Sequence, residues 1–344
     1  MVKNKSISDN NLNEIILKTN NLSKKFGKNF VVKNLNLEVH KGETIGFVGP
    51  NGAGKTTTIK LIAKLLRPTT GNILIKNKRN NLQDISVSSQ DLISMGFLID
   101  IPVFYDSNPN VLLKHYAKLH NYPKEKINQR IEELLSYFNL INWKKKRIKT
   151  FSKGMKQKLG FIQAIFHDPE IIFLDEPQTG LDPKARIKIR QYLKTFKEQN
   201  TTIFIASHML REISEICDKI AFINNGEIIK FDRIENMEKL LKTSEIMCQL
   251  LEPIPIERLE LVEKKLNEKL APYLDKNIDP TIVESPVQYQ PSSKNLTIYY
   301  DGRPESKGEI FKILGKDFDS EFTVISFSQS KTSLLEKLYL EKIK

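Results

Sequence analysis

The chain of 344 residues is 40% hydrophobic and 28% charged, a composition that suits a globular protein of about two domains. No apolar run approaches the roughly 20 residues that cross a bilayer, and the first residues have neither the apolar core nor the cleavage site of a secretory signal, so we expect no membrane span and a cytosolic location. The formal charge of +13 favours an anionic membrane surface, a nucleotide or nucleic acid as partner, or reflects lysines spread over the whole surface.

The chain begins with a polar segment, residues 1–13, that we expect to be disordered. From residue 14 to residue 235, apolar β-type runs alternate with helical patterns, which is typical of an α/β domain built on a mainly parallel sheet. Its clearest strands are predicted at 45–48, 171–174, 202–206 and 219–223. Between residues 109 and 168 apolar residues spaced by three and four predict helices at 111–119, 124–138 and 153–166. This part is expected to be a helical subdomain inserted into the α/β core.

The strand predicted at 45–48 leads into eight residues that fit the pattern G-x-x-x-x-G-K-[ST], with an apolar-faced helix predicted at 57–66. Glycines let backbone N–H groups turn toward a phosphate, and the following helix adds its positive dipole end. Lys55 would reach the β- and γ-phosphates, and the hydroxyl of Thr56 would bind Mg²⁺. We therefore expect a nucleoside triphosphate to be bound by Gly49, Pro50, Asn51, Gly52, Ala53, Gly54, Lys55, Thr56 and Thr57.

Two carboxylates, Asp175 and Glu176, directly follow the strand predicted at 171–174. They would lie at the carboxyl end of a strand, where open α/β sheets bind their ligands. Asp175 would hold Mg²⁺, and Glu176 would polarise the water that attacks the γ-phosphate. His208, after the strand predicted at 202–206, would orient that water. Each of these is an ordinary strand end when taken alone, but downstream of a phosphate loop they predict a magnesium-dependent hydrolytic site.

After residue 235 the pattern changes, and residues 236–344 are expected to form a separate small α+β domain. A helix is predicted through residues 258–270, followed by a loop rich in Pro, Ser and Gln at 284–293. A strand at 296–300, a helix at 305–314, a strand at 322–326 and a helix at 332–343 complete the domain. Cys217 and Cys248 lack metal-ligand spacing and are predicted to be buried thiols.

Together these motifs, in this order over residues 15–232, resemble the ATP-binding subunit of an ABC transporter. The resemblance implies the fold of a P-loop NTPase, ATP and Mg²⁺ as cofactors, and two ATP molecules held between two subunits. It gives Phe26 the position that stacks on adenine and His208 that of the switch histidine. It places Asp182 in the loop that crosses the dimer interface. It identifies residues 150–157 as the signature segment that caps the γ-phosphate bound by the opposite subunit, with Ser152, Lys153, Gly154 and Met155 as the expected binding residues.

Two departures from the family pattern concern this site. The signature reads Ser-Lys-Gly-Met instead of the commoner Ser-Gly-Gly-Gln, which keeps the hydroxyl of Ser152 and the backbone of Gly154 and adds the cation of Lys153. The family's glutamine beside the metal is replaced by Asp100, in a context similar to a branch associated with bacitracin resistance and lantibiotic immunity. A carboxylate is a harder ligand for Mg²⁺ than an amide, so Asp100 is a third expected metal ligand.

The resemblance also implies partners and a location. Separate integral-membrane permease subunits would contact the segment 100–119, and a second ATPase subunit, expected to be the same chain, would complete the dimer at the inner face of the cell membrane. Drug, antibiotic or peptide export is the expected task, and no nucleic acid is expected. Two alternatives remain open: a soluble ATPase of this fold acting on the ribosome or on nucleic acid, and a nucleotide-gated regulator without turnover. The single phosphate loop argues against the first, and Glu176 with His208 argues against the second.

Overall fold

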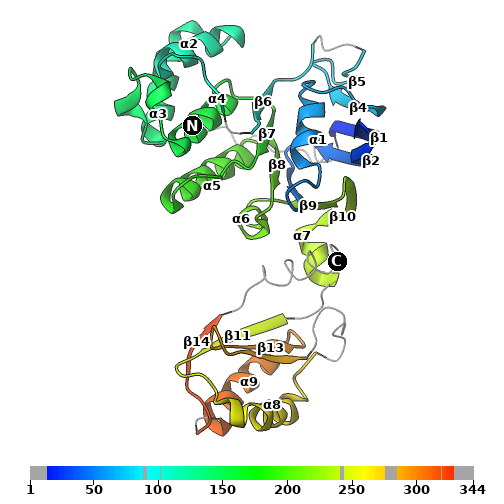
Figure 1. Cartoon of the computed structure of the whole chain (residues 1–344), viewed down its shortest axis with the longest axis vertical. Coiled ribbons are helices and arrows are strands. Elements are labelled where there is room, and N and C mark those ends of the chain that lie inside the picture. The colour runs from blue at the N-terminus through cyan, green and yellow to red at the C-terminus, as the bar shows by residue number, and fades with distance from the viewer. Residues whose placement is uncertain are drawn as a thin grey trace, which may run out of the picture. The chain divides into compact units, whose positions relative to one another are not determined.

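The computed structural model describes residues 14–87, 91–100, 102–240, 244–275, 285–318 and 320–328. Contacts along the chain divide it into two units, Met1–Arg233 and Ile234–Lys344 (Figure 1). Each unit has its own hydrophobic core. The division falls two residues before the domain boundary expected from the sequence. The expected tail at 1–13 and the expected helix at 332–343 lie outside the described residues, among which no helix is long and apolar enough to cross a membrane.

A six-stranded sheet in the order β10-β9-β3-β8-β7-β6 forms the centre of the first unit. Five of its strands run parallel, and only β10 pairs antiparallel, with β9. Every residue of the three central strands is buried, as expected for a parallel sheet that is covered on both faces. The predicted mainly parallel sheet is therefore confirmed, with strands at Thr44–Val48 (β3), Met95–Leu98 (β6), Ile171–Asp175 (β7), Thr202–Ser207 (β8), Lys219–Asn224 (β9) and Glu227–Arg233 (β10).

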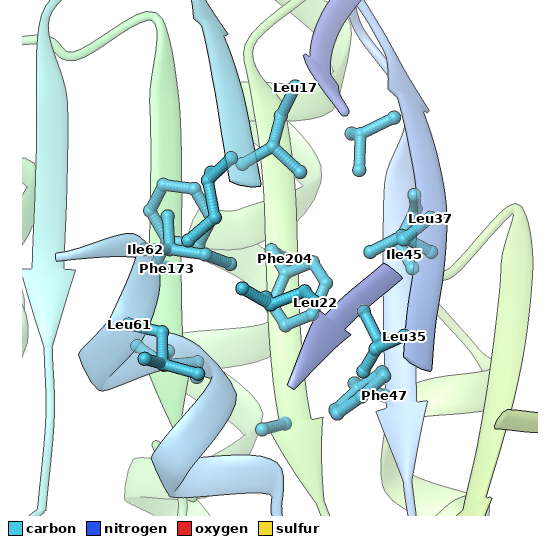
Figure 2. Close-up of a cluster of buried hydrophobic side chains, with 14 of the residues drawn as sticks. Leu17, Leu22, Leu35, Leu37, Ile45, Phe47, Leu61, Ile62, Phe173 and Phe204 are labelled. Atoms are coloured by element: carbon cyan, nitrogen blue, oxygen red, sulfur yellow. The ribbon is translucent and has the colours of Figure 1, made fainter. Parts of the chain in front are cut away.

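A second, antiparallel sheet has the strand order β2-β1-β4-β5 and shares the core with the first sheet. The sequence did not predict its strands. Its strands are Ile15–Phe26 (β1), Asn29–His40 (β2), Thr70–Lys76 (β4) and Leu82–Asp84 (β5). Figure 2 shows how the leucines of β1 and β2 meet side chains of helix α1 (Lys55–Ile62) and of the parallel strands. This core fixes the hairpin between β1 and β2 beside the loop that follows β3.

The helices predicted between residues 109 and 168 are present as α2 (Pro109–Leu119), α3 (Ile127–Tyr137) and α4 (Lys153–Ile165), grouped at one side of the unit (Figure 1). The second begins later than predicted, because Lys124–Lys126 forms a 3₁₀ turn. Helix α4 lies close to β6, where a side-chain carbon at Gly96 would overlap the carbonyl oxygen of Ala164. Helices α5 (Pro183–Glu198) and α6 (Leu210–Ser214) complete the unit.

The second unit is an antiparallel sheet in the order β12-β13-β11-β14, covered by two helices whose apolar residues share its core. Its elements are α7 (Ile234–Leu240), β11 (Ser244–Leu250), α8 (Ile256–Leu270), β12 (Val287–Gln290), β13 (Asn295–Tyr300), α9 (Pro304–Asp317) and β14 (Val324–Ser328). The prediction of a loop through 284–293 was wrong at β12, whose residues pair with β13. Strand β11 was missed. The α+β class of the unit is confirmed.

Candidate functional site

The loop after β3 turns directly into α1 and leaves the helix N-terminus open. Gly54 occupies the N-cap position with φ of 105°, and no side chain caps the helix. A side-chain carbon at Gly54 would meet the carbonyl oxygen of Val31 at 2.5 Å, and one at Gly49 would overlap that of Ile223. Both glycines are therefore required by the close approach of neighbouring backbone. The uncapped N–H groups of α1 offer donors and a positive dipole end to an anion.

Lys55 is buried beneath this loop, with 6% of its surface exposed. Its Nζ donates to the carbonyl oxygens of Gly49 at 2.7 Å and Pro50 at 3.0 Å and lies 3.8 Å from Oε1 of Glu176. Burial lowers the pKa of Lys55, and the nearby carboxylates of Glu176 and Asp175 oppose that shift. The lysine is thus a partly desolvated cation placed between the phosphate loop and the acidic strand end.

Thr56 and Asp175 meet at the base of the site, where the threonine hydroxyl donates to Oδ2 of Asp175 at 2.5 Å. Asp175 is 2% exposed, and its second oxygen, Oδ1, is buried without a hydrogen-bond partner. Burial raises the pKa of Asp175, and the charges of Asp100 and Glu176 raise it further. An ionised carboxylate with an unpaired buried oxygen beside a hydroxyl fits a hard divalent cation such as Mg²⁺.

Asp100 is the third predicted metal ligand, and it has a different partner in this structure. Its carboxylate pairs with Nζ of Lys60 at 2.6 Å, and its backbone has a φ of 55°. Lys60 lies on α1, one turn after Thr56, so the same helix carries the threonine and the lysine that holds Asp100. This pair cannot be predicted from the sequence, because no local pattern relates residues 60 and 100.

Glu176 and His208 directly follow β7 and β8 and lie together at the carboxyl ends of these strands. The backbone N–H of His208 donates to Oε1 of Glu176 at 3.0 Å, and Nδ1 lies 2.8 Å from the same oxygen. Because a carboxylate only accepts, the proton of this contact is on Nδ1. Ser207 Oγ donates to Oε2 at 3.3 Å. Glu176 itself has a φ of 46°, a left-handed conformation that is costly for a residue with a side chain.

A cavity of about 490 Å³ joins these groups in one space. Its lining comes from the phosphate loop, the carboxyl ends of the parallel strands and helix α4: Asn51, Thr56, Asp100, Gln157, Asp175, Glu176, Thr179 and His208. From the sequence, Gln157 is the last residue of the signature segment 150–157 and has no predicted role of its own. The only sequence signal for it is its place five residues after Ser152, and only the fold brings it to Glu176.

Phe26 ends β1 in the hairpin beside the phosphate loop and is 47% exposed, with Nζ of Lys24 5.0 Å from the ring centre. Phe30 on β2 is similarly exposed. The strand register pairs Phe26 with Asn29 and Phe30 with Lys25. Paired residues share a face, and neighbouring residues alternate, so the two rings belong to opposite faces of the hairpin.

The predicted signature residues do not line this cavity. Ser152 is the N-cap of α4, and its Oγ accepts from the N–H of Met155 at 3.2 Å. Gly154 faces the loop after β7, where a side-chain carbon would meet the carbonyl oxygen of Gly180 at 2.9 Å. Lys153 is exposed. The N-terminus of α4, which Ser152 caps and whose first turn has no acidic residue, therefore lies outside this cavity.

Asp182 also lies outside the cavity and caps a helix instead. Its Oδ1 accepts from the N–H of Ala185 at 2.9 Å at the start of α5, and this bond lowers the pKa of the carboxyl. The structure thus brings together the phosphate loop, Asp175, Glu176, His208 and Asp100. It leaves the signature residues and Asp182 on a separate part of the surface.

Comparisons with known families and proteins agree on one group. The family model described as "ABC transporter" matches residues 32–179. The bacitracin transport ATP-binding protein BcrA of Bacillus licheniformis is 37% identical over 234 residues, which are 65% of this chain and 72% of that protein. The lantibiotic transport ATP-binding protein SrtF of Streptococcus pyogenes is 35% identical over 228 residues, 65% of this chain and 95% of that protein.

A solved structure is similar over the same part of the chain. It is a dimeric ATP-binding cassette in a post-hydrolysis state bound to ADP and Pi, 26% identical, with a TM-score of 0.56. The similarity covers 63% of this chain and 98% of that one. The two relatives and the solved structure each match about two thirds of this chain, and the family model matches less than half of it.

Proposed function

The chain belongs to the ABC transporter family as an ATP-binding and ATP-hydrolysing subunit, and from this premise we propose how its site works and which process it powers. The proposal is carried by the cavity in which Thr56, Asp175, Glu176 and His208 meet at the open N-terminus of α1. This arrangement places N–H donors, the cation of Lys55, the metal-binding oxygen of Asp175 and the base Glu176 around one cavity. These are the groups that hydrolysis of a nucleoside triphosphate requires.

ATP binding begins at the phosphate loop. The N–H groups at the start of α1 would hold the phosphates, while Lys55 would exchange the two loop carbonyls for phosphate oxygens. Because Lys55 is buried in surroundings of low dielectric, its attraction to the phosphate oxygens would be stronger than in water. Phe26, at the edge of the β1–β2 hairpin, would stack on the adenine. Its ring would then contact both the base and Nζ of Lys24.

Thr56 and Asp175 would hold Mg²⁺, and Asp100 would join them once its contact with Lys60 opens. The ion, when bound, neutralises charge on the phosphates and polarises them for attack. The unpaired Oδ1 of Asp175 would gain the partner that it lacks.

Hydrolysis would follow from the position of Glu176. Its carboxylate would accept a proton from the attacking water as the water oxygen bonds to the γ-phosphorus and the bond to the β-phosphate oxygen breaks, which gives ADP and phosphate. His208 donates from Nδ1 to the same carboxylate and would hold it toward the water. The left-handed backbone at Glu176 supports this role, since such strain is concentrated at functional sites.

Two copies would close around two ATP molecules, each bound by the phosphate loop of one copy and by the α4 N-terminus of the other. The end of α4 with Ser152, Lys153, Gly154 and Met155 does not line the cavity beside the chain's own phosphate loop, which supports a role in a second copy's site. Asp182 would lie at the interface between copies. The similar cassette bound to ADP and Pi is itself dimeric.

The partners and cargo are proposed from the relatives. BcrA and SrtF are named for bacitracin and lantibiotic transport, so we propose export of a peptide antibiotic through separate integral-membrane subunits. The chain would then act at the inner face of the cell membrane. The segment before α2 would contact the permease, because Val103 and Tyr105 are more than nine-tenths exposed apolar side chains there.

The test compares ATP turnover with Mg²⁺ in the parent chain, in Glu176→Gln and in Glu198→Gln, a matched change at an exposed glutamate in the last turn of α5. Turnover is expected to fall at least roughly 100-fold in Glu176→Gln, with ATP affinity retained, and to persist in Glu198→Gln. An inert parent chain that binds ATP would contradict the hydrolytic role. For the transport role, the chain is expected in the membrane fraction only when a membrane partner is co-expressed.

A further inference from the structure

Helix α4 touches the hydrolytic end of the site through one buried side chain. Gln157 is 2% exposed, and its Nε2 donates to the backbone carbonyl oxygen of Glu176 at 3.1 Å. A backbone carbonyl only accepts, so the amide nitrogen is the end that faces it. A buried amide is costly without such a partner, and the contact is therefore well defined. None of the roles discussed above uses this residue.

The Gln157 bond acts on a backbone that needs support. Glu176 has a φ of 46°, which an L side chain adopts at an energetic cost. Its N–H donates to the carbonyl oxygen of Ala206 at 2.9 Å, and its carbonyl accepts from both Gln157 and the N–H of Thr179, the latter at 3.1 Å. The peptide groups on both sides of Glu176 are thus held. The Gln157 bond is the one among these that comes from a side chain and from another helix.

Helix α4 is also fixed to the surroundings of the site along its length. Gly154 in its first turn faces the carbonyl of Gly180 in the loop after Glu176. A side-chain carbon at Gly160 would overlap Pro102, two residues after Asp100. Close packing of this kind transmits displacement, because tightly packed elements move as units. A shift of α4 would therefore reach the backbone of Glu176 through Gln157.

We propose that Gln157 is a positioning residue that holds the backbone of Glu176 in its active conformation from helix α4. This inference rests on the proposed function, in which the N-terminus of α4 holds the triphosphate of the second copy. Gln157 then links two sites within one chain: the nucleotide at the end of α4 in one site and the carboxylate that hydrolyses the nucleotide in the other. The hydrolysing group of each site thereby depends on occupancy of its neighbour.

The first test is the substitution Gln157→Met in the full chain, with Gln163→Met in the last turn of the same helix as the matched control. Methionine keeps length and flexibility but cannot donate the bond. We expect kcat for ATP to fall roughly tenfold in Gln157→Met, with KM and the affinity for Mg²⁺-ATP changed less than about twofold, because the contact acts on the carboxylate and not on substrate binding. Gln163→Met should match the parent. Gln157→Leu replaces the first variant if that one does not fold, as judged by its thermal unfolding.

A mixed dimer separates the effect of Gln157 on Glu176 of its own chain from an effect of α4 on the nucleotide that its N-terminus would hold in the other copy's site. A limiting active copy, with Glu176, is mixed before ATP addition with a large excess of an inert Glu176→Gln copy, so that one site of each mixed dimer turns over. We expect Gln157→Met to lower turnover when it is placed in the active copy. In the inert copy, whose α4 holds the nucleotide of the active site, it should have no effect.

Three results would overturn the proposal: an effect in the inert copy alone, equal effects in both arrangements, or no effect in either arrangement.

Ser152→Ala in the active copy, whose α4 end faces the inert site, tests the link between the sites. It should lower turnover when Gln157 is present and have little further effect beside Gln157→Met, and additive effects would overturn the link. Failure of the proposed function looks different: the unsubstituted mixture would then show no Mg²⁺-dependent ATP turnover at all.

Discussion

At the scale of single residues, the site contains a buried charge that would be balanced only when a ligand binds. Asp175 is ionisable, buried and only half paired, and burial raises its pKa. For an acid with a raised pKa in the folded state, stability is lost as the pH rises from the ordinary value through the raised one. At neutral pH the charge of Asp175 therefore opposes folding until a cation pairs with it.

This balance predicts that two similar substitutions change the thermal midpoint differently. Asp175→Asn should raise the thermal midpoint of the protein without Mg²⁺ and abolish the further rise that Mg²⁺-ATP gives the parent. Asp182→Asn should lower the midpoint or leave it unchanged, because the bond from Ala185 lowers the pKa of Asp182 and the charge favours the folded helix end. Thermal unfolding with and without Mg²⁺-ATP measures both. A lower midpoint for Asp175→Asn without the metal would contradict the argument.

The aromatic contact to adenine is tested by comparing two phenylalanines. Phe26→Ala should weaken ATP affinity by about 1–3 kcal/mol, the usual contribution of stacking between a base and an aromatic ring. Phe30→Ala is the matched control, since its ring has a similar exposure but belongs to the other face of the same hairpin. Calorimetric titration with ATP gives both values. Equal losses would show that the hairpin as a whole, and not one ring, supports the nucleotide.

At the scale of elements, the features that could be predicted from the sequence are those with a contiguous pattern of residues. The phosphate loop, the strand ending in Asp175 and Glu176, and helices α2 to α4 each have a contiguous pattern of residues. The short strands β11 and β12 carry no strong alternation, and β12 lies in a segment rich in Pro and Gln that is typical of loops. The contacts of Gln157 with Glu176 and of Lys60 with Asp100 join residues far apart in sequence. Only the arrangement of the elements produces them.

His120, just after α2, and His167, just after α4, stack their imidazole rings. We expect the stability of this contact to depend on pH. The rings of His120 and His167 lie 3.9 Å apart, and the ring of Tyr116 packs against both. Burial, with the nearby His120, lowers the pKa of His167 from 6.5 to about 4. A base with a lowered pKa in the folded state contributes stability above its ordinary pKa, and this contribution is lost as the pH falls toward the lowered one.

Acidification from pH 6.5 toward pH 4 should therefore destabilise the contact between these helices. His167→Gln should lose less thermal stability than the parent over this range, because glutamine can keep a donor near the carbonyl of Met95 and does not titrate. His115→Gln, at an exposed position of α2, should behave as the parent does. Identical pH profiles for the parent and His167→Gln would refute this source of acid sensitivity.

At the scale of the whole molecule, the proposed function makes the site described here one half of a functional unit. The phosphate loop, the acidic strand end and His208 lie together around one cavity, and the N-terminus of α4 does not line it. A triphosphate enclosed by both surfaces requires a second copy, and its cleavage removes the contact that joins them. The chain is therefore expected to alternate between an open state and a closed dimer, and to pass that movement to a membrane partner.

The most direct measurement is the mass of the Glu176→Gln variant in sedimentation, with and without Mg²⁺-ATP. The account predicts one chain without nucleotide and two chains with it, because ATP binds but is not cleaved. Lys55→Ala should remain a single chain under both conditions. A Glu176→Gln chain that binds ATP and still sediments as a monomer would contradict the claim that two copies close around the nucleotide.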